Sequence, residues 1–311
     1  MMDLPTVDKL NFEEKNVLVR GDFDVDNGEN PRADSIREII RFLLSKNASK
    51  IKIIGHTETE YDLSSQLKSE FPDIEFDSGL RKNPGEKENN IDFARQLAIG
   101  WNIYINESFA TSHRQHASIV TLPKVIKDNG GEVCLGIRFQ KEIENLSRVI
   151  SNPQRPVIMA ISGIKEDKLS YIEPFCKFAD KLLIGGKLPD LLHQEVNENE
   201  KIIVADLIAD REDITIHSIE KFEQEISRAG TVVVSGPVGK FEDEGHRQGT
   251  ERIFRSVVAN KNAFKLAGGG DTERAIQALN VTDGFDWISV GGGAMLDFLA
   301  NGTLPGIEAL K

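Results

Sequence analysis

Glycine-rich turns are the feature of this sequence that is best suited to holding a phosphorylated ligand. Each follows a short apolar run in the second half of the chain, and the five are Ser162-Gly163, Gly185-Gly186, Ser235-Gly236-Pro237-Val238-Gly239, Gly268-Gly269-Gly270 and Gly291-Gly292-Gly293. Glycine after a parallel strand lets a ligand approach backbone N–H groups, and a helix that begins there attracts phosphate. None of these turns matches the fingerprints GxGxxG or GxxxxGK[ST]. Any one of them could simply connect a strand to a helix, but five together predict a nucleotide or phosphate site.

Charged residues accompany two of these turns. Asp271 follows the glycines at 268–270, and its carboxylate suits Mg²⁺, which prefers oxygen ligands, as well as it suits the N-cap of a helix. Lys165 and Lys168 follow Gly163 and lie three residues apart, so they share a face if the segment is helical. The alternative for the two lysines is a solvated surface pair.

Cationic side chains that suit a small anionic substrate are found in the first half of the chain. They lie near predicted strand ends or in loops, and they are Arg20, Arg32, Arg81, Arg114, His56, His113 and His116. Arg32 is expected in a loop before a helix. The planar guanidinium group matches the oxygens of carboxylate and phosphate. Taken singly, each cation is better explained as a surface charge, but together they would form an anion pocket if they converge.

Short β-branched runs that alternate with amphipathic segments must position these residues. The runs predict strands near 17–19, 51–54, 103–105, 157–161, 182–184, 202–204, 232–234, 264–266 and 287–290. Apolar residues at 36, 39, 40, 43 and 44 form one stripe of a helix, with Asp34 or Ser35 as its expected cap. Alternating strands and helices indicate an α/β fold with parallel sheets.

The number of predicted strands is large for one open sheet, so two sheets in two domains are expected. The polar segment 151–156, which contains Pro153 and Pro156, is the expected boundary. The predicted domains are residues 1–152 and 153–299, with residues 300–311 as a candidate to pack back on the first domain.

Composition excludes several classes of protein. The 311 residues include 38 basic and 50 acidic side chains, a formal charge of −12, which argues against a general binder of nucleic acid or anionic membranes. No apolar run approaches the ~18 residues needed to span a bilayer, and the N-terminal residues lack the pattern of a signal peptide. Two cysteines cannot form a disulfide framework. We therefore expect a cytoplasmic protein with free thiols.

Six motifs in order resemble those of the phosphoglycerate kinase family. Residues 17–25 (VLVRGDFDV) are similar to the family's VLVRxDFNV, and residues 106–118 (NESFATSHRQHAS) to NDAFGTAHRAHAS. Residues 235–242 (SGPVGKFE) resemble NGPxGxFE, and residues 268–272 match GGGDT. Residues 291–299 (GGGAMLDFL) resemble GGGASLEFL, and residues 304–307 match the closing LPGI.

The resemblance implies a fold and a reaction. The fold would be two α/β domains, each a doubly wound, mostly parallel sheet flanked by helices, with a cleft between them. The reaction would be reversible phosphoryl transfer between ATP and the carboxylate of 3-phosphoglycerate, giving ADP and 1,3-bisphosphoglycerate, with Mg²⁺, in glycolysis and gluconeogenesis. The implied partners are these small molecules, without nucleic acid or membrane, and nothing in the sequence requires more than a monomer.

The resemblance also implies roles for individual residues. The phosphoglycerate contacts would be Arg20, Asp22, Asp24, Arg32, His56, Arg81, His113 and Arg114. The nucleotide contacts would be Gly163, Lys165, Lys168, Gly185, Gly186, Pro237, Glu242, Gly270, Asp271 and Thr272. Asp271 would also contact the metal. The catalytic residues would be Arg32, Lys165, Gly269 and Gly292.

The chain departs from the family pattern at the site itself. Asp24 replaces an asparagine, which places a carboxylate near an anionic substrate. Residues 56–60 (HTETE) replace HLGRP, so Thr59 stands where the family has a phosphate-binding arginine. The spacing between Lys165 and Lys168 is one residue shorter than in GGAKVSDK. These changes leave two hypotheses: an active, compact phosphoglycerate kinase, or a degenerate paralogue that binds nucleotide or another phosphorylated ligand without turnover.

Overall fold

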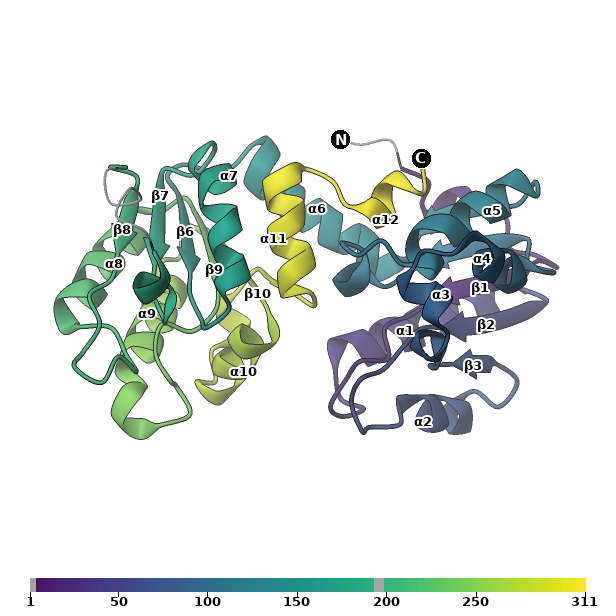
Figure 1. Ribbon diagram of the computed structural model, residues 1–311, viewed down its shortest axis with the longest axis horizontal. Coiled ribbons are helices and arrows are strands. Elements are labelled where there is room, and N and C mark those ends of the chain that lie inside the picture. The colour runs from purple at the N-terminus through teal and green to yellow at the C-terminus, as the bar shows by residue number, and fades with distance from the viewer. Residues whose placement is uncertain (1–3, 193–198) are drawn as a thin grey trace. The chain divides into compact units, whose positions relative to one another are not determined.

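The computed structural model describes residues 4–192 and 199–311, which form two compact units (Figure 1). The first unit comprises Met1–Glu144 with Thr303–Lys311, and the second comprises Asn145–Gly302. The division falls inside one continuous helix, α6 (Ile137–Ser151). The polar segment 151–156, which the sequence suggests as the boundary, begins where that helix ends.

The first unit is built on a five-stranded parallel sheet with the order β3-β2-β1-β4-β5. Its strands are β1 (Asn16–Arg20), β2 (Lys50–Ile54), β3 (Glu75–Asp77), β4 (Ile103–Asn106) and β5 (Glu132–Leu135). Its helices are α1 (Pro31–Ser45), α2 (Leu63–Glu70), α3 (Pro84–Lys87), α4 (Ile91–Ala98), α5 (Leu122–Asp128) and α12 (Pro305–Glu308). The strand order reverses direction beside β1, so right-handed crossovers place helices on both faces of the sheet.

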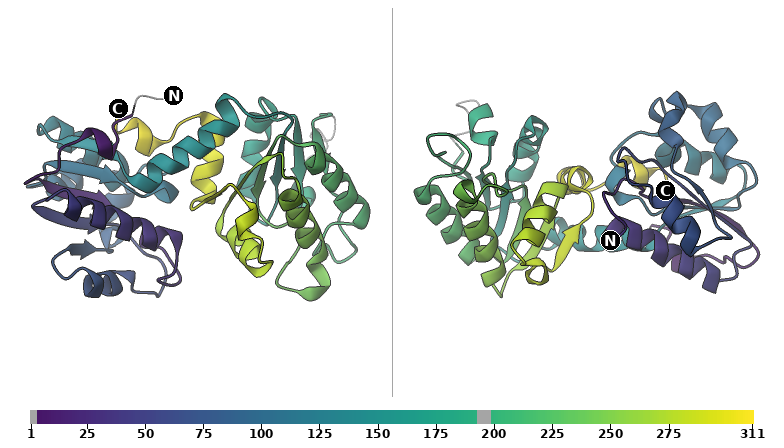
Figure 2. Two further views of the ribbon diagram at one scale, coloured as in Figure 1. Left: turned by 180° about the vertical axis from the view of Figure 1, so that it is seen from behind. Right: turned by 90° about the horizontal axis from the view of Figure 1, so that it is seen from below.

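The second unit contains a six-stranded parallel sheet with the order β11-β10-β9-β6-β7-β8. Its strands are β6 (Val157–Ile161), β7 (Lys181–Ile184), β8 (Ile202–Val204), β9 (Thr231–Ser235), β10 (Phe264–Gly268) and β11 (Trp287–Ser289). Its helices are α7 (Ile172–Cys176), α8 (Ile216–Arg228), α9 (Gln248–Ala259), α10 (Gly270–Ala278) and α11 (Gly292–Asn301). Figure 2 shows these helices around the strands from two further directions. The prediction of two α/β sheets is confirmed.

Each sheet has one point where neighbouring strands lead to connections on opposite faces. In the first unit it lies between β1 and β4, where Arg20 pairs with Asn106, and in the second between β6 and β9, where Ile161 pairs with Ser235. The loops at the carboxyl ends of such strands diverge and leave a crevice, which is where ligands bind in open α/β sheets. The topology alone therefore points to the loops after β1, β4, β6 and β9.

Helix α1 follows from the spacing of its apolar residues, but it begins earlier than the sequence-based prediction. Ile36, Ile39 and Ile40 are fully buried in the first core, and burying each such side chain stabilises the fold by roughly 1.5–3 kcal/mol. The N-cap is Asn30, whose side chain accepts from the backbone N–H of Arg32 at 2.9 Å, followed by Pro31. The expectation of Asp34 or Ser35 as the cap was wrong, and so was a loop position for Arg32, because Pro31 begins the helix earlier.

Two strands escaped the sequence analysis. Strand β3 is three residues long and lies at a sheet edge, with its side chains partly exposed. Strand β5 begins at Glu132 directly after Gly130-Gly131 and has only three buried residues. Strand β3 lacks a run of consecutive apolar residues, whereas β5 has the short run Val133-Cys134-Leu135, which the sequence-based prediction did not include.

The C-terminal residues join the first unit, where the N–H of Gly306 donates to the Ser112 carbonyl at 2.9 Å.

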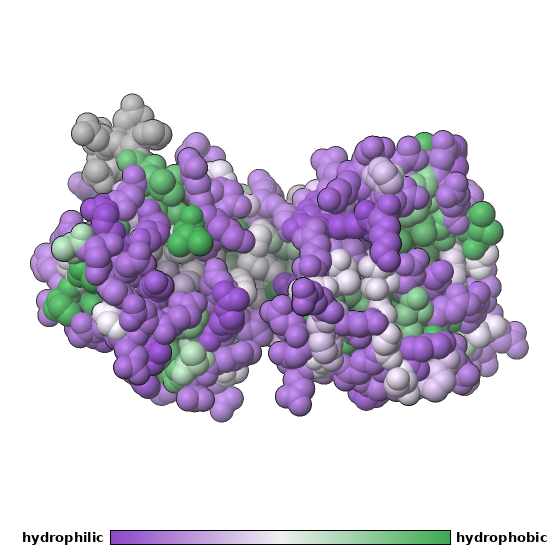
Figure 3. Space-filling view, turned by 60° about the horizontal axis from the view of Figure 1, so that its bottom comes forward, coloured by the Kyte–Doolittle hydropathy of each residue, from purple (hydrophilic) through white to green (hydrophobic). Residues whose placement is uncertain are grey.

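Hydrophilic residues predominate on the face shown in Figure 3, with apolar residues in small separate patches. Among the described residues, no helix has the length and apolar character needed to cross a bilayer.

Candidate nucleotide and anion sites

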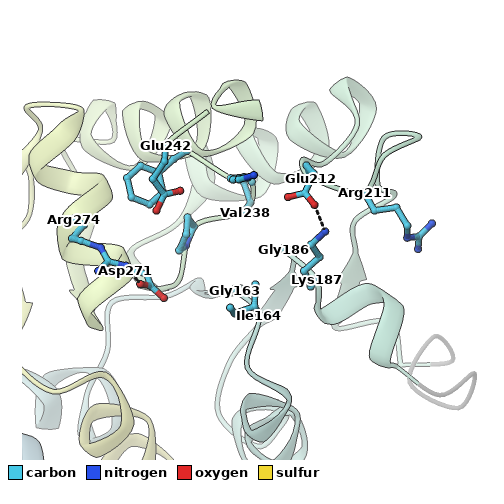
Figure 4. Close-up of a pocket in the computed structure, with 14 residues that line it drawn as sticks. Gly163, Ile164, Gly186, Lys187, Arg211, Glu212, Val238, Glu242, Asp271 and Arg274 are labelled. Atoms are coloured by element: carbon cyan, nitrogen blue, oxygen red, sulfur yellow. Dashed lines mark hydrogen bonds and ion pairs between the residues drawn. The ribbon is translucent and has the colours of Figure 1, made fainter. Parts of the chain in front are cut away.

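A cavity of about 320 Å³ lies at the carboxyl edge of the second sheet. Its walls come from the loops after β6, β7 and β9, from the segment before α8 and from the first turns of α10 (Figure 4). The lining residues are Gly163, Ile164, Gly186, Lys187, Arg211, Glu212, Pro237, Val238, Gly239, Lys240, Phe241, Glu242, Asp271 and Arg274. The crevice expected from the topology, beside β6 and β9, is thus a real pocket.

Two glycine turns form a wall without side chains. Gly163 has a φ of 112° and Gly186 a φ of 65°, conformations that favour glycine. A Cβ on Gly186 would lie 2.5 Å from the backbone nitrogen of Gly163, so any larger residue would push the two turns apart. The Gly186 N–H donates to the Val238 carbonyl at 3.2 Å, which joins this wall to the turn after β9.

Five residues predicted to bind nucleotide line this cavity: Gly163, Gly186, Pro237, Glu242 and Asp271. Their positions follow from the glycine turns and from α10, which begins immediately after β10. Glu242 is exposed and Asp271 half-buried, so both carboxylates are accessible to a ligand.

Two other predicted nucleotide residues, Lys168 and Thr272, form hydrogen bonds with the turns beside this wall. The Lys168 ammonium donates to the carbonyls of Ser162 at 2.6 Å and Ser235 at 3.1 Å, and burial lowers its pKa to about 8. The Thr272 hydroxyl accepts from the Gly236 N–H at 2.8 Å and donates to the Gly268 carbonyl. Both side chains therefore tie neighbouring turns together, and their contact with a nucleotide stays a prediction.

The other predicted residues of this unit lie outside the lining. Lys165 is exposed and precedes the 3-10 helix Glu166–Tyr171, next to Ile164 of the wall. Gly185 is buried at the end of β7, and Gly270 is the exposed first residue of α10. A Cβ on Gly292 would lie 2.6 Å from the Cα of Gly269, so these two turns pack against each other.

Five charged residues of the pocket were not predicted from the sequence: Lys187, Arg211, Glu212, Lys240 and Arg274. Lys187 and Glu212 form an ion pair at 2.8 Å on one side, and Arg274 pairs with Asp271 on the other (Figure 4). Arg274 lies three residues after Asp271 on α10, a spacing that could have revealed the pair. Glu212 comes from a segment without any motif, and only the fold brings it to Lys187.

The donor atoms of the pocket suit a hard cation. Glu212, Glu242 and Asp271 each contribute a carboxylate to the lining, and Mg²⁺ typically takes one or two carboxylates together with substrate phosphates. Among the described residues, no group of three or more His, Cys, Asp or Glu side chains is arranged to hold a metal alone. A cation here would therefore arrive with a phosphorylated ligand.

The first unit carries a buried polar network at the end of β1. Arg20 is fully buried, and its guanidinium group donates to the Ser118 hydroxyl at 3.0 Å, to the Gly21 carbonyl and to Nδ1 of His56 at 2.8 Å. The Ser118 hydroxyl in turn donates to the buried Glu86 carboxylate at 2.6 Å. Arg20 is therefore held within the unit by each of its three nitrogens, and its contact with a substrate stays a prediction.

The two histidines of this network are neutral. Burial is the main cause that lowers the pKa of His56 to about 2 and that of His116 to about 4, and nearby Arg20, Arg81 and Arg114 add to it. Their ring centroids are 6.2 Å apart. Because Nδ1 of His56 accepts from Arg20, the ring proton of His56 lies on Nε2, so Nε2 is a hydrogen-bond donor on a neutral ring.

Three further guanidinium groups surround this network. Arg81 is largely buried, and Arg114 is exposed in the turn after β4, beside the half-buried His113. Arg32, in the first turn of α1, lies 3.5 Å from Asp22 and donates to the carbonyl of Asp24 at 2.9 Å. The pKa of Arg81 is lowered by burial and by Arg114, which places these cations close enough to repel one another.

Carboxylates meet several of these cations. Glu58 forms an ion pair with Arg81, and the Asp24 carboxylate accepts from the Glu58 N–H at 2.9 Å. The Thr59 hydroxyl, which stands where the family has an arginine, donates to the Val25 carbonyl at 2.8 Å. Two of the three departures from the family pattern, Asp24 and residues 56–60, are therefore in direct contact beside Arg81.

Comparison with known proteins identifies relatives. The family model for phosphoglycerate kinase matches residues 78–202 and 190–302. The phosphoglycerate kinase of Solibacter usitatus is 32% identical over 275 residues, covering 74% of this chain and 69% of the relative. That of Dictyoglomus turgidum is 28% identical, covering 90% of this chain and 81% of the relative.

Solved structures show the same fold. The phosphoglycerate kinase of Coxiella burnetii superposes with a TM-score of 0.83 at 23% identity, covering 99% of this chain and 98% of that chain. The enzyme of Pyrococcus horikoshii has a TM-score of 0.80, also at 23% identity, with the same coverage. At this identity the likeness establishes the two-unit fold.

Proposed function

The chain belongs to the phosphoglycerate kinase family, and we propose that it transfers the γ-phosphoryl group of ATP reversibly to the carboxylate of 3-phosphoglycerate. The products are ADP and 1,3-bisphosphoglycerate, so the reaction serves glycolysis and gluconeogenesis. We propose that Asn145–Gly302 binds the nucleotide and that Met1–Glu144 with Thr303–Lys311 binds the acceptor. The proposal includes a cytoplasmic location and a monomeric state.

The pocket of the second unit carries this proposal. We propose that a nucleotide base lies against the turns of Gly163 and Gly186, and that the exposed Glu242 carboxylate accepts from ribose hydroxyls. Asp271 lies in the first turn of α10, where a helix N-terminus attracts phosphates. Asp271 would hold Mg²⁺ together with the phosphates. When bound, Mg²⁺ neutralises oxygens of the transferred phosphoryl group.

The first unit supplies the acceptor site in this proposal. Arg32, Arg81 and Arg114 provide cations, and His56 provides a neutral donor at Nε2. A carboxylate acceptor is already a nucleophile and requires no general base, so the residues have to position the acceptor and offset its charge. The neutral histidines are consistent with this chemistry because no proton has to be removed.

Lys165 and Arg32 are the residues that we assign to the phosphoryl group in transfer. Lys165 is exposed next to the pocket wall, and Arg32 lies at the start of α1 with its side chain one-quarter exposed. Charges that meet the phosphoryl oxygens only in the transition state accelerate the reaction rather than merely bind substrate.

A coupled assay with ATP, 3-phosphoglycerate and Mg²⁺ tests the proposal. We expect turnover with all three and none when 3-phosphoglycerate or Mg²⁺ is left out. Folded protein that binds both substrates without turnover would contradict it.

The second candidate is a paralogue that binds nucleotide but does not transfer phosphate. Glu58 on Arg81 and the carboxylate of Asp24 favour it, because both oppose an anionic acceptor. Ligand-dependent melting distinguishes the two: stabilisation by ADP but not by 3-phosphoglycerate indicates the paralogue.

A further inference from the structure

We propose that Glu58 is an internal competitor in the acceptor site: its carboxylate occupies Arg81 until the phosphate group of the acceptor displaces it. This inference rests on the proposed function. Glu58 would then act as an internal substitute for the phosphate, which an incoming phosphate group has to outcompete. Glu58 would therefore weaken the binding of acceptors that carry a phosphate group and leave the binding of acceptors without one unchanged.

The backbone of Glu58 is held in place while its side chain is free to move. Its N–H donates to the Asp24 carboxylate at 2.9 Å, and the next residue, Thr59, is fixed to the Val25 carbonyl at 2.8 Å. The side chain of Glu58 is 58% exposed. Its carboxylate can therefore turn into solvent by side-chain rotation alone, without any rearrangement of the loop.

Arg81 is a largely buried cation with charged neighbours of both signs. Its side chain is only 14% exposed; Arg114 and Arg20 oppose its charge, whereas Asp24 and Glu86 favour it. Its Nε is buried and, among the described residues, has no hydrogen-bond partner. Arg81 therefore has an N–H group that the Glu58 carboxylate does not engage, and a partner with more oxygens could accept a hydrogen bond from it.

A phosphate monoester is that partner. It carries about −1.5 to −2 charges near pH 7 and three acceptor oxygens, against one charge and two oxygens for a carboxylate. A dianion also gains more than a monoanion from Arg114, the cation that most strongly opposes the charge of Arg81. A ligand without phosphate has no such advantage over Glu58 and would leave the Glu58–Arg81 pair intact.

Calorimetric binding of 3-phosphoglycerate to the wild type and to Glu58→Gln and Glu58→Ala tests the inference. Removing the competing charge should tighten binding roughly fivefold, the scale of one partly exposed ion pair. Glu60→Gln is the matched control, because Glu60 is an exposed carboxylate of the same loop and its loss changes the net charge equally. It should leave the affinity unchanged.

Glycerate, the acceptor without its phosphate, separates displacement from a general electrostatic effect. Its affinity should be the same in the wild type and in Glu58→Gln, because it does not compete for Arg81. Equal 3-phosphoglycerate affinity in the wild type and both Glu58 variants, or weaker binding in the variants, would overturn the inference.

Failure of the proposed function gives a different result. If 3-phosphoglycerate binds to none of the proteins while ADP binds to all of them, the inference falls with the function. If both ligands bind without turnover, the function fails alone and the comparison of the Glu58 variants still tests the inference. Tighter 3-phosphoglycerate binding in the Glu58 variants, with unchanged ADP binding, supports the inference independently of turnover.

Discussion

The guanidinium group of Arg20 donates to Nδ1 of His56 across 2.8 Å, with both side chains buried at the end of the first sheet. Because Nδ1 of His56 accepts from Arg20, the proton of the neutral ring lies on Nε2, and a positive charge on the ring beside Arg20 is unfavourable. The pair therefore presents a neutral, oriented donor where a cationic histidine would be the simplest expectation for an anion site.

This relationship predicts how stability depends on pH. The pKa of His56 is lowered to about 2 in the folded protein, whereas an unfolded histidine titrates near 6.5. Below about pH 6.5 the unfolded chain takes up a proton that the folded protein does not. As the pH decreases, the free energy of unfolding therefore decreases by at most about 1.4 kcal/mol per pH unit for this group. Urea unfolding at about pH 7.5 and 5.5 should show a smaller loss for His56→Gln. Equal losses in the two proteins would contradict a neutral buried ring.

The network behind His56 predicts a coupled pair of substitutions. Arg20→Met leaves the fully buried Glu86 carboxylate without the cation that reaches it through Ser118, and we expect a loss of roughly 3–5 kcal/mol in unfolding free energy. Adding Glu86→Gln should recover part of that loss, because it removes the uncompensated charge. Strictly additive effects in a double-mutant cycle would show that the two residues are not coupled.

Lys165→Ala should separate catalysis from binding. Lys165 is exposed and lies outside the cavity lining, so its removal should change the KM for ATP little. If its charge meets the transferred phosphoryl group, kcat should fall roughly 100-fold or more. Steady-state kinetics with both substrates varied decide this, and an effect confined to KM would remove Lys165 from that role.

Asp271 should govern how Mg²⁺ assists nucleotide binding. The measurement is the ratio of ADP affinities with Mg²⁺ and with EDTA, for the wild type and for Asp271→Asn. We expect the ratio to collapse toward one in the variant because the only carboxylate at the start of α10 that lines the described pocket is lost. A ratio equal to that of the wild type would place the metal elsewhere.

Asp24→Asn should tighten binding of 3-phosphoglycerate. Asparagine keeps the side-chain oxygen that accepts from the Glu58 N–H at 2.9 Å but removes a negative charge beside the acceptor site. We expect an affinity gain of a few-fold with little change in melting temperature. Weaker binding would mean that the carboxylate itself is recruited by the substrate or by a neighbouring arginine.

Much of the architecture was readable from local patterns. Consecutive apolar residues at 157–161 and 232–234 predicted strands because a strand covered on both faces needs them. The glycine turns after those strands predicted a ligand edge because glycine is required where two backbones approach closely. Strand β3 and the Asn30 cap were missed because short edge strands and caps depend on single residues with weak signals.

The sequence by itself determined the alternation of strands and helices, the glycine-edged pocket and the family, since these rest on local spacing and ordered motifs. Only the tertiary structure decided which charged side chains are exposed and which are bonded to groups within their own unit. Arg20 and Lys168 are predicted ligand contacts, and only the fold shows that they also bond buried groups of their own unit, the Ser118 hydroxyl and the carbonyls of Ser162 and Ser235. Burial and hydrogen-bond satisfaction are properties of the packed fold, so spacing along the chain cannot reveal them.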